Sequence, residues 1–226
     1  MNNEETQLIV GVVGTQNTGK STFIQDVRNA TAYRANESNR FVTVGVDYRK
    51  KIADLGLQIN RNGNIESQNI IFDCLVESID KAVESTNYNR IIMDRTPIDA
   101  YVYTVWLANN NGVNITSEIL SNMYKRMMYY SKMLDCIVYI PLSKCEDVTV
   151  VDSKFRDTNL AYREQIDGLF QATLDEITSH KKKIEVIEVY GTRDTRVDMF
   201  LEWERRACDW EYTSREMREL QLLMES

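Results

Sequence analysis

The sequence predicts an α/β fold in three layers, with helices on both faces of a mostly parallel sheet. Short apolar segments without polar alternation recur along the chain, and longer segments with apolar residues at helical spacing separate them. The first pattern is typical of strands buried on both faces, and its alternation with helices is typical of parallel sheets. No internal repeat and no linker rich in Pro, Gly or Ser divides the 226 residues, so we expect one domain over 1–226.

Four segments are predicted to be core strands. The first covers 7–13 and is bounded by glycine, and the second covers 89–94 and ends in an acidic residue. The third covers 134–140 and is closed by Pro141, and the fourth covers 184–189. The first, at least, is short and nearly continuously apolar, as a strand buried on both faces is expected to be.

Helical spacing of apolar residues predicts the helices between these strands. In 20–30, Phe23, Ile24 and Val27 recur at this spacing. The other helical segments are 46–55, 65–83, 98–108, 117–133 and a long one that ends near 180. The polar stretch 143–159 is expected to be mobile. The segment 214–224 is predicted to form a terminal helix that packs back or contacts another copy of the chain, as in a homodimer.

The composition excludes several classes of protein. A hydrophobic fraction of 43% and a charged fraction of 27% are those of an ordinary globular protein. The net charge of -7 gives no general attraction to polyanions, so a nucleic acid would need a local basic patch. The four cysteines lie far apart without metal-like spacing and are expected to be reduced thiols. No apolar run reaches membrane-spanning length, and no signal peptide precedes the first strand, so we expect a cytoplasmic protein without membrane contact.

The most specific motif follows the first strand. Residues 14–21, GTQNTGKS, fit the phosphate-loop pattern G-x-x-x-x-G-K-[ST] at every fixed position. Glycines let successive N–H groups face one anion, and the N-terminus of the next helix adds partial positive charge. Lys20 is expected to reach the β- and γ-phosphates of ATP, and Ser21 to hold Mg²⁺. The residues predicted to bind the nucleotide are Gly14, Thr15, Asn17, Thr18, Gly19, Lys20, Ser21 and Thr22. The predicted fold is therefore a three-layer P-loop NTPase fold.

Among P-loop proteins, the sequence favours a kinase of small molecules. No N-K-x-D segment for reading guanine occurs, and such kinases close their own arginines over the phosphates. Asp94 and Arg95 follow the second predicted strand, at the edge of the sheet where ligands bind. Asp94 is predicted to be a metal ligand or general base, and Arg95 a catalytic residue that clamps phosphate or acceptor. A helix cap and a surface ion pair are the structural alternatives.

Three segments carry a resemblance to a known family. They are the phosphate loop, the sequence DRTPIDAY at 94–101, and DSKFRD at 152–157 followed by Tyr162 and Arg163. Together they resemble the P-loop kinases that include the nicotinamide riboside kinase domain of NadR, which are related to thymidylate and deoxyribonucleoside kinases. The resemblance extends over about 7–200.

The resemblance implies roles for several further residues. It implies a helical lid over 143–163 in which Arg156 is catalytic and Arg163 binds the nucleotide, and it implies that Tyr101 binds the acceptor. The family also commonly has an acid and a basic residue after a strand at 41–44. By this resemblance Asp47 is a candidate general base beside Asp94, and Arg49 holds the acceptor. Alternatively, Asp47 is an acidic residue favoured by a helix dipole.

These observations predict a Mg²⁺-dependent kinase that moves the γ-phosphate of ATP to a hydroxyl or phosphate of a nucleoside or nucleotide. Two alternatives stay open. One is a phage-type kinase that phosphorylates a hydroxymethylated base in DNA, and the other is an ATP-dependent regulatory switch or binding module. A basic groove would favour DNA as acceptor, and its residues would be Arg34, Arg40, Arg49, Lys50 and Lys51.

Overall fold

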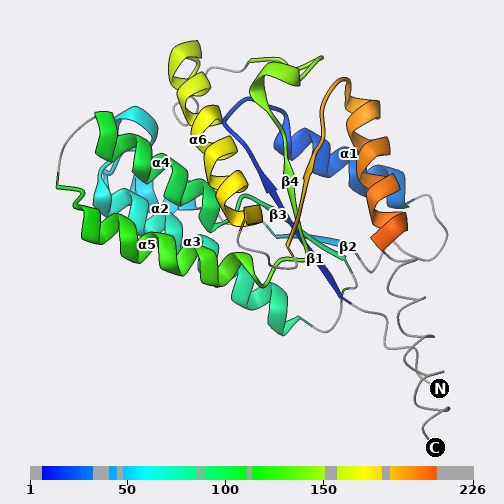
Figure 1. Ribbon diagram of the computed structural model, residues 1–226, viewed down its shortest axis with the longest axis horizontal. Coiled ribbons are helices and arrows are strands. Elements are labelled where there is room, and N and C mark those ends of the chain that lie inside the picture. Colours follow the sequence, from blue (N-terminus) through cyan, green and yellow to red (C-terminus); the bar gives the residue numbers. More distant parts are fainter. Residues whose placement is uncertain are drawn as a thin grey trace, which may run out of the picture.

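One parallel sheet forms the centre of the protein (Figure 1). The structure is a computed structural model that describes residues 7–32, 41–44, 48–85, 88, 90–110, 114–150, 157–179 and 184–207. The strands are β1 (Leu8–Val13), β2 (Phe41–Val44), β3 (Arg90–Asp94), β4 (Cys136–Tyr139) and β5 (Glu185–Glu188). Their order is β2-β3-β1-β4-β5, and every neighbouring pair is parallel.

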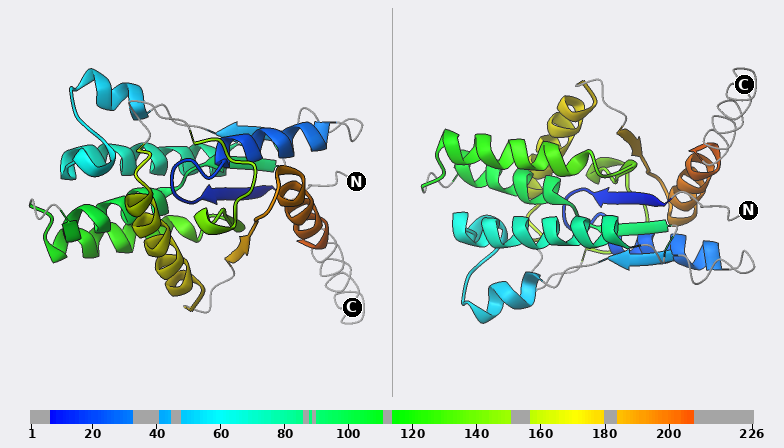
Figure 2. Two further views of the ribbon diagram at one scale, coloured as in Figure 1. Left: turned by 90° about the horizontal axis from the view of Figure 1, so that it is seen from above. Right: turned by 90° about the horizontal axis from the view of Figure 1, so that it is seen from below.

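Helices cover both faces of this sheet (Figures 1 and 2). The labelled helices are α1 (Lys20–Ala32), α2 (Tyr48–Asp54), α3 (Ile65–Glu84), α4 (Pro97–Asn110), α5 (Ser117–Ser131) and α6 (Leu160–Ser179), with short 3-10 turns at η1 (Asn60–Asn62) and η2 (Leu142–Lys144). A further helix covers 193–207. It lies with α1 on one face, and α3 to α6 lie on the other. The predicted three-layer α/β fold is thereby confirmed.

Alternation along the strands divides the core into two halves. Val10 and Val12 of β1 pack in the cluster with α1 and the helix 193–207, whereas Ile9 and Val13 pack in the cluster with α3, α4 and α6. Successive side chains of a strand point to opposite faces, so a strand covered on both faces is apolar at every position. This is why β1 reads as a continuous apolar run.

The helix 193–207 is a difference from the sequence prediction, which assigned no helix there. Polar contacts join it to the inner strand β3 and the edge strand β5: Arg90 Nε donates to Glu204 Oε1 at 2.6 Å, and Trp203 Nε1 donates to Glu185 Oε2 at 2.7 Å. Phe200 meets Phe23 of α1 edge to face, with ring centroids 5.9 Å apart. The helix therefore completes, with α1, the layer on this face of the sheet.

The sheet order places a topological switch point at the carboxyl end of β1. The chain passes from β1 to β2 at one edge of the sheet, returns to β3 beside β1, and then crosses to β4 and β5 on the other side. Open α/β sheets bind ligands at this point, where the adjacent loops diverge. The loop 14–19 follows β1 there. Within the described ranges, no helix combines the length and the hydrophobicity needed to cross a bilayer.

Candidate functional site

Two glycines give the loop after β1 its shape. Gly14 has φ +139°, and a Cβ atom on it would lie 2.7 Å from the carbonyl oxygen of Ile140. Gly19 has φ +85°, and a Cβ atom there would lie 3.0 Å from Nη1 of Arg196. Residues other than glycine rarely adopt either backbone conformation. The two fixed glycines of the motif are thus required by turn geometry and by close packing of the loop.

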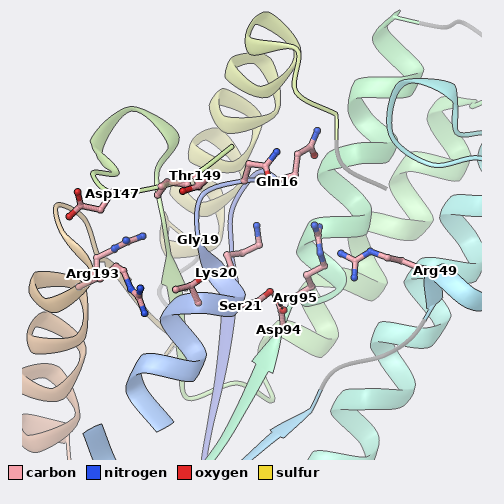
Figure 3. Close-up of a pocket in the computed structure, with 14 residues that line it drawn as sticks. Gln16, Gly19, Lys20, Ser21, Arg49, Asp94, Arg95, Asp147, Thr149 and Arg193 are labelled. Carbon is pink, nitrogen blue, oxygen red and sulfur yellow. Dashed lines mark hydrogen bonds between the residues drawn. The ribbon is translucent and has the colours of Figure 1, made fainter. Parts of the chain in front are cut away.

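The loop opens onto a cavity of about 250 Å³. The cavity is lined by Gln16, Asn17, Gly19, Lys20, Ser21, Thr22, Arg49, Asp94, Arg95, Asp147, Val148, Thr149, Arg193 and Arg196. Figure 3 shows Arg193 and Asp147 at one end of it, Arg49 and Arg95 at the other, and Lys20 between them. The lining is strongly cationic, with four arginines and one lysine against two aspartates. Such a cavity favours an elongated anion.

Lys20 is buried at the centre of this cavity without a carboxylate partner among the described residues. Its Nζ donates to the carbonyl oxygens of Gly14 at 2.7 Å and Thr15 at 2.5 Å. Burial, together with the nearby Arg95 guanidinium, lowers the pKa of Lys20 to about 7. An anion placed beside Nζ would reverse this effect, because an opposite charge favours the protonated amine.

We therefore expect nucleotide binding to take up a proton. Phosphates beside Lys20 raise its pKa above 7 in the complex, so the protonated form binds better and affinity falls as pH rises above 7. The fall is expected to approach tenfold per pH unit until the pKa of the complex is reached. Calorimetry of AMP-PNP binding with excess Mg²⁺, in buffers of different ionisation enthalpy at pH 8, measures the uptake directly. Lys20→Met should bind without it; equal proton uptake by both proteins would contradict the assignment.

Ser21 and Asp94 bring two oxygen ligands together beside Lys20. Ser21 Oγ in the first turn of α1 donates to Asp94 Oδ2 at 2.6 Å. The contact exists because β1 and β3 pair in parallel with Val12 opposite Asp94, so the strand end and the helix start share one edge. A hydroxyl and a carboxylate are hard oxygen donors of the kind that Mg²⁺ accepts along with phosphate oxygens.

Arg95 stands in a strained backbone conformation. Its φ is +81°, and its N–H donates to the carbonyl oxygen of Val12 at 3.1 Å. Its guanidinium pairs with Asp99 at 3.2 Å and lies over the Tyr103 ring, 6.0 Å from the centroid. Burial raises the pKa of Asp99 to about 6, against the opposing effect of Arg95. Strain at a non-glycine residue of this kind is often found where a side chain is aimed for function.

A second, smaller cavity lies on the other side of Arg95. It is lined by Tyr48, Ile59, Asn60, Gln68, Ile71, Arg95, Asp99, Ala100 and Tyr103. The Oε1 atom of Gln68 is buried and has no hydrogen-bond partner in the described part of the chain. Buried polar atoms are nearly always paired, and a cavity of about 20 Å³ has room beside this atom for one hydrogen-bond donor, either a water molecule or a group of a ligand. The sequence analysis missed Gln68; the available signal was a polar residue on the apolar face of a predicted helix.

The structure brings together most of the described residues predicted for the site. The loop residues, Asp94, Arg95 and Arg49 all gather at the first cavity or in its wall. Asp47, Arg156 and the segment 214–224 lie outside the described residues, as do Arg34 and Arg40 of the expected basic groove. The remaining two residues of that groove, Lys50 and Lys51, are exposed on α2.

Tyr101 and Arg163 lie elsewhere than expected. Tyr101 packs on Tyr124 of α5, with ring centroids 5.6 Å apart, and does not line either cavity. Residues two apart on a helix point roughly 200° apart, so α4 presents Tyr103 to the second cavity instead. Arg163 binds the loop from outside the cavity, through the carbonyl oxygens of Gln16 and Asn17.

The fold and the phosphate loop together define a P-loop NTPase fold, and comparison with solved structures refines this to the fold of P-loop kinases. NadR in complex with NAD and AMP-PNP is similar at a TM-score of 0.52 and 16% identity, over 87% of this chain and 49% of that one. This chain therefore spans about half the length of NadR. Thymidylate kinase from Ehrlichia chaffeensis is similar at a TM-score of 0.57 and 10% identity, over 87% and 98% of the two chains.

Deoxyadenosine kinase from M. mycoides with bound dCMP and dCDP gives a TM-score of 0.52 and 14% identity, over 88% of this chain and 100% of that one. No protein-family model matches the sequence, and no curated protein matches it. The resemblance inferred from the sequence motifs is confirmed, since all three neighbours are P-loop kinases. At 10–16% identity the similarity is one of fold.

Proposed function

We propose that the protein transfers the γ-phosphate of ATP to a hydroxyl or phosphate of a nucleoside- or nucleotide-type acceptor. The observation that carries the proposal is the position of Arg95, which among the described residues is the one that lines both cavities. Phosphoryl transfer requires the donor phosphate and the acceptor to meet at a point of positive charge. Arg95 supplies that charge between the phosphate loop and the second cavity.

In this proposal, the role of each residue follows from its position in the first cavity. Lys20 and the loop hold the β- and γ-phosphates, and Arg49 and Arg95 neutralise charge that develops during transfer. Ser21 and Asp94 would hold Mg²⁺, which when bound would offset the negative charge of the phosphate oxygens that repels the attacking group. The base of the nucleotide would lie toward Arg193, at the far end of the cavity from Arg49 and Arg95. Asp94 as a general base, and Asp47 beside it, stay predictions.

The second cavity has a volume of about 20 Å³, so an acceptor must widen it on binding, and its lining suits a flat, mostly uncharged group. Tyr48 and Tyr103 supply aromatic walls, and the buried Arg95–Asp99 pair has no net charge. The unpaired Oε1 of Gln68 suits an N–H or O–H donor, such as the exocyclic amine of a base. These features favour a nucleobase over a sugar phosphate as the group that this cavity binds.

A screen for acceptor-dependent ATP consumption tests the proposal. The panel contains nucleosides, nicotinamide riboside, nucleoside monophosphates and hydroxymethylated DNA, with mass detection of the product. Turnover that requires a nucleoside or nucleotide supports the proposal. Phosphorylated DNA would instead establish the hydroxymethyl-base kinase. Slow ATP hydrolysis that no acceptor accelerates would point to a switch and overturn the proposal.

Gln68→Leu is expected to weaken the acceptor without affecting ATP. Leucine has nearly the same volume as glutamine but lacks its amide group. The KM for the acceptor found by the screen should therefore rise about 10- to 100-fold. Affinity for AMP-PNP should stay within about twofold. Gln25→Leu, on the exposed face of α1, serves as the matched control. An unchanged acceptor KM would remove Gln68 from the site.

A further inference from the structure

Five consecutive carbonyl oxygens of the phosphate loop are bound by buried cations. The five consecutive carbonyls are those of Gly14, Thr15, Gln16, Asn17 and Thr18. Lys20 binds the first two, Arg163 binds the next two at 3.1 and 3.0 Å, and Arg196 binds the last at 3.1 Å. The three cations come from three different helices, so the arrangement depends on the tertiary fold.

Burial lowers the pKa of Arg163, and the nearby Asp167 carboxylate opposes this effect only in part. Arg163 and Arg196 are 5% and 2% exposed, and in the described part of the chain neither forms an ion pair. The remaining bonds of Arg196 also go to backbone carbonyls, those of Thr192 and Glu146. Burying a cation without a counter-charge is unfavourable unless something else favours it. The polyphosphate chain of a nucleotide in the adjacent cavity would supply the counter-charge that no ion pair provides in the described part of the chain.

The direction of these bonds fixes the direction of the loop's N–H groups. In a trans peptide the C=O and N–H bonds point in opposite directions. Because Arg163 holds the carbonyls of Gln16 and Asn17 from outside the cavity, the N–H groups of Asn17 and Thr18 are turned the other way, toward the cavity. An anion nest needs this orientation before the ligand arrives.

The side chain of Gln16 forms two further hydrogen bonds that hold the phosphate loop in place. Its Oε1 accepts a hydrogen bond from the Tyr103 hydroxyl of α4, and its Nε2 donates to the carbonyl oxygen of Asp157 at 3.2 Å. Asp157 lies just before α6, the helix that carries Arg163 in its first turn. The Gln16 side chain, in the wall of the phosphate cavity, therefore ties the loop to α4 and to the segment just before α6.

We propose that Arg163 is a positioning residue of the phosphate loop, which holds two carbonyls outward so that the N–H groups face the phosphates, with Arg196 holding the next carbonyl. This inference rests on the proposed nucleotide binding. It differs from direct phosphate binding, because Arg163 acts on the loop in the free protein. Its loss therefore alters the empty loop as well as the complex.

Two measurements on Arg163→Gln and Arg163→Lys test the proposal. The first is amide hydrogen exchange of the nucleotide-free protein, where peptides covering 14–22 should exchange at least about tenfold faster, while those in α3 stay unchanged. The second is calorimetric affinity for inorganic tripolyphosphate and for AMP-PNP, both with Mg²⁺. Each should weaken by a similar factor of about 10- to 100-fold in Arg163→Gln, because both use the loop. Lysine cannot form two forked bonds, so it should rescue only in part.

Arg90→Gln is the matched control, because Arg90 is a partly buried arginine at the opposite end of β3 from Asp94. It should lower the unfolding temperature without changing either loop exchange or affinity. If Arg163→Gln loses affinity but exchange in the free loop is unchanged, Arg163 is a direct phosphate ligand. If both exchange and affinity are unchanged, Arg163 has no role in the loop. Either result overturns the proposal. If Arg163→Gln does not fold, Arg163→Lys, which keeps the buried charge, decides the question. A wild-type protein that binds neither probe overturns the proposed function, and this inference with it.

Discussion

Lys20→Met is expected to lower phosphoryl transfer by about 10²- to 10³-fold while leaving the protein folded. The ammonium group lies in the middle of the cavity, between the loop and the arginines at its two ends (Figure 3). Methionine fills nearly the same volume and removes the charge. Loss of the two hydrogen bonds to Gly14 and Thr15 is offset by relief from burying an ammonium group, so the free energy of unfolding should change by less than about 1 kcal/mol.

The measurements are steady-state kinetics with the acceptor found by the screen, and thermal unfolding without ligand. Lys144→Met is the control, because this exposed lysine pairs with Glu188 outside the cavity and should behave as wild type. Turnover near the wild-type rate in Lys20→Met would remove the loop from the reaction. A large loss of stability would instead show that Lys20 holds the loop together in the free protein.

The parts of the site that the sequence predicted are those that local chemistry determines. The loop 14–21 needs glycines at two backbone positions and a lysine and a serine at the start of a helix, and all of these lie within eight residues. Asp94 was predictable because a strand end is recognisable from its apolar run, and the ends of parallel strands share one edge. The bounds of β2 agree with the predicted strand 41–44, and those of α3 differ from 65–83 by one residue.

The parts that were missed depend on contacts between distant segments. Arg163 was assigned to the nucleotide by resemblance, but its contacts with the loop lie 146 and 147 residues away in sequence, and no spacing reveals them. Tyr103 and Tyr101 are both tyrosines of one helix, and only the packing of α4 decides which one faces the cavity. The helix 193–207 escaped prediction because its burial depends on Phe23 and on the sheet edge, which are not adjacent in sequence.

Asp94→Asn is expected to lower kcat by about 10²-fold or more and to leave nucleotide binding largely intact. Asparagine keeps the shape of the side chain but removes the charge that would attract Mg²⁺ beside Ser21 Oγ, 2.6 Å away. The affinity of AMP-PNP should therefore lose its dependence on Mg²⁺, while its affinity without metal stays within a few-fold of wild type. Calorimetry with and without Mg²⁺, on the wild type and on the variant, measures this difference directly.

The partner of this carboxylate provides the control that separates metal binding from general-base chemistry. If Ser21 and Asp94 hold one ion together, Ser21→Ala should lose part of the same Mg²⁺ dependence, and the effects of Ser21→Ala and Asp94→Asn should not add in the double variant. Additive effects would mean that the two side chains act separately. If Asp94→Asn lowers kcat but keeps the full Mg²⁺ dependence, Asp94 acts on the acceptor proton, and Ser21 holds the metal without it.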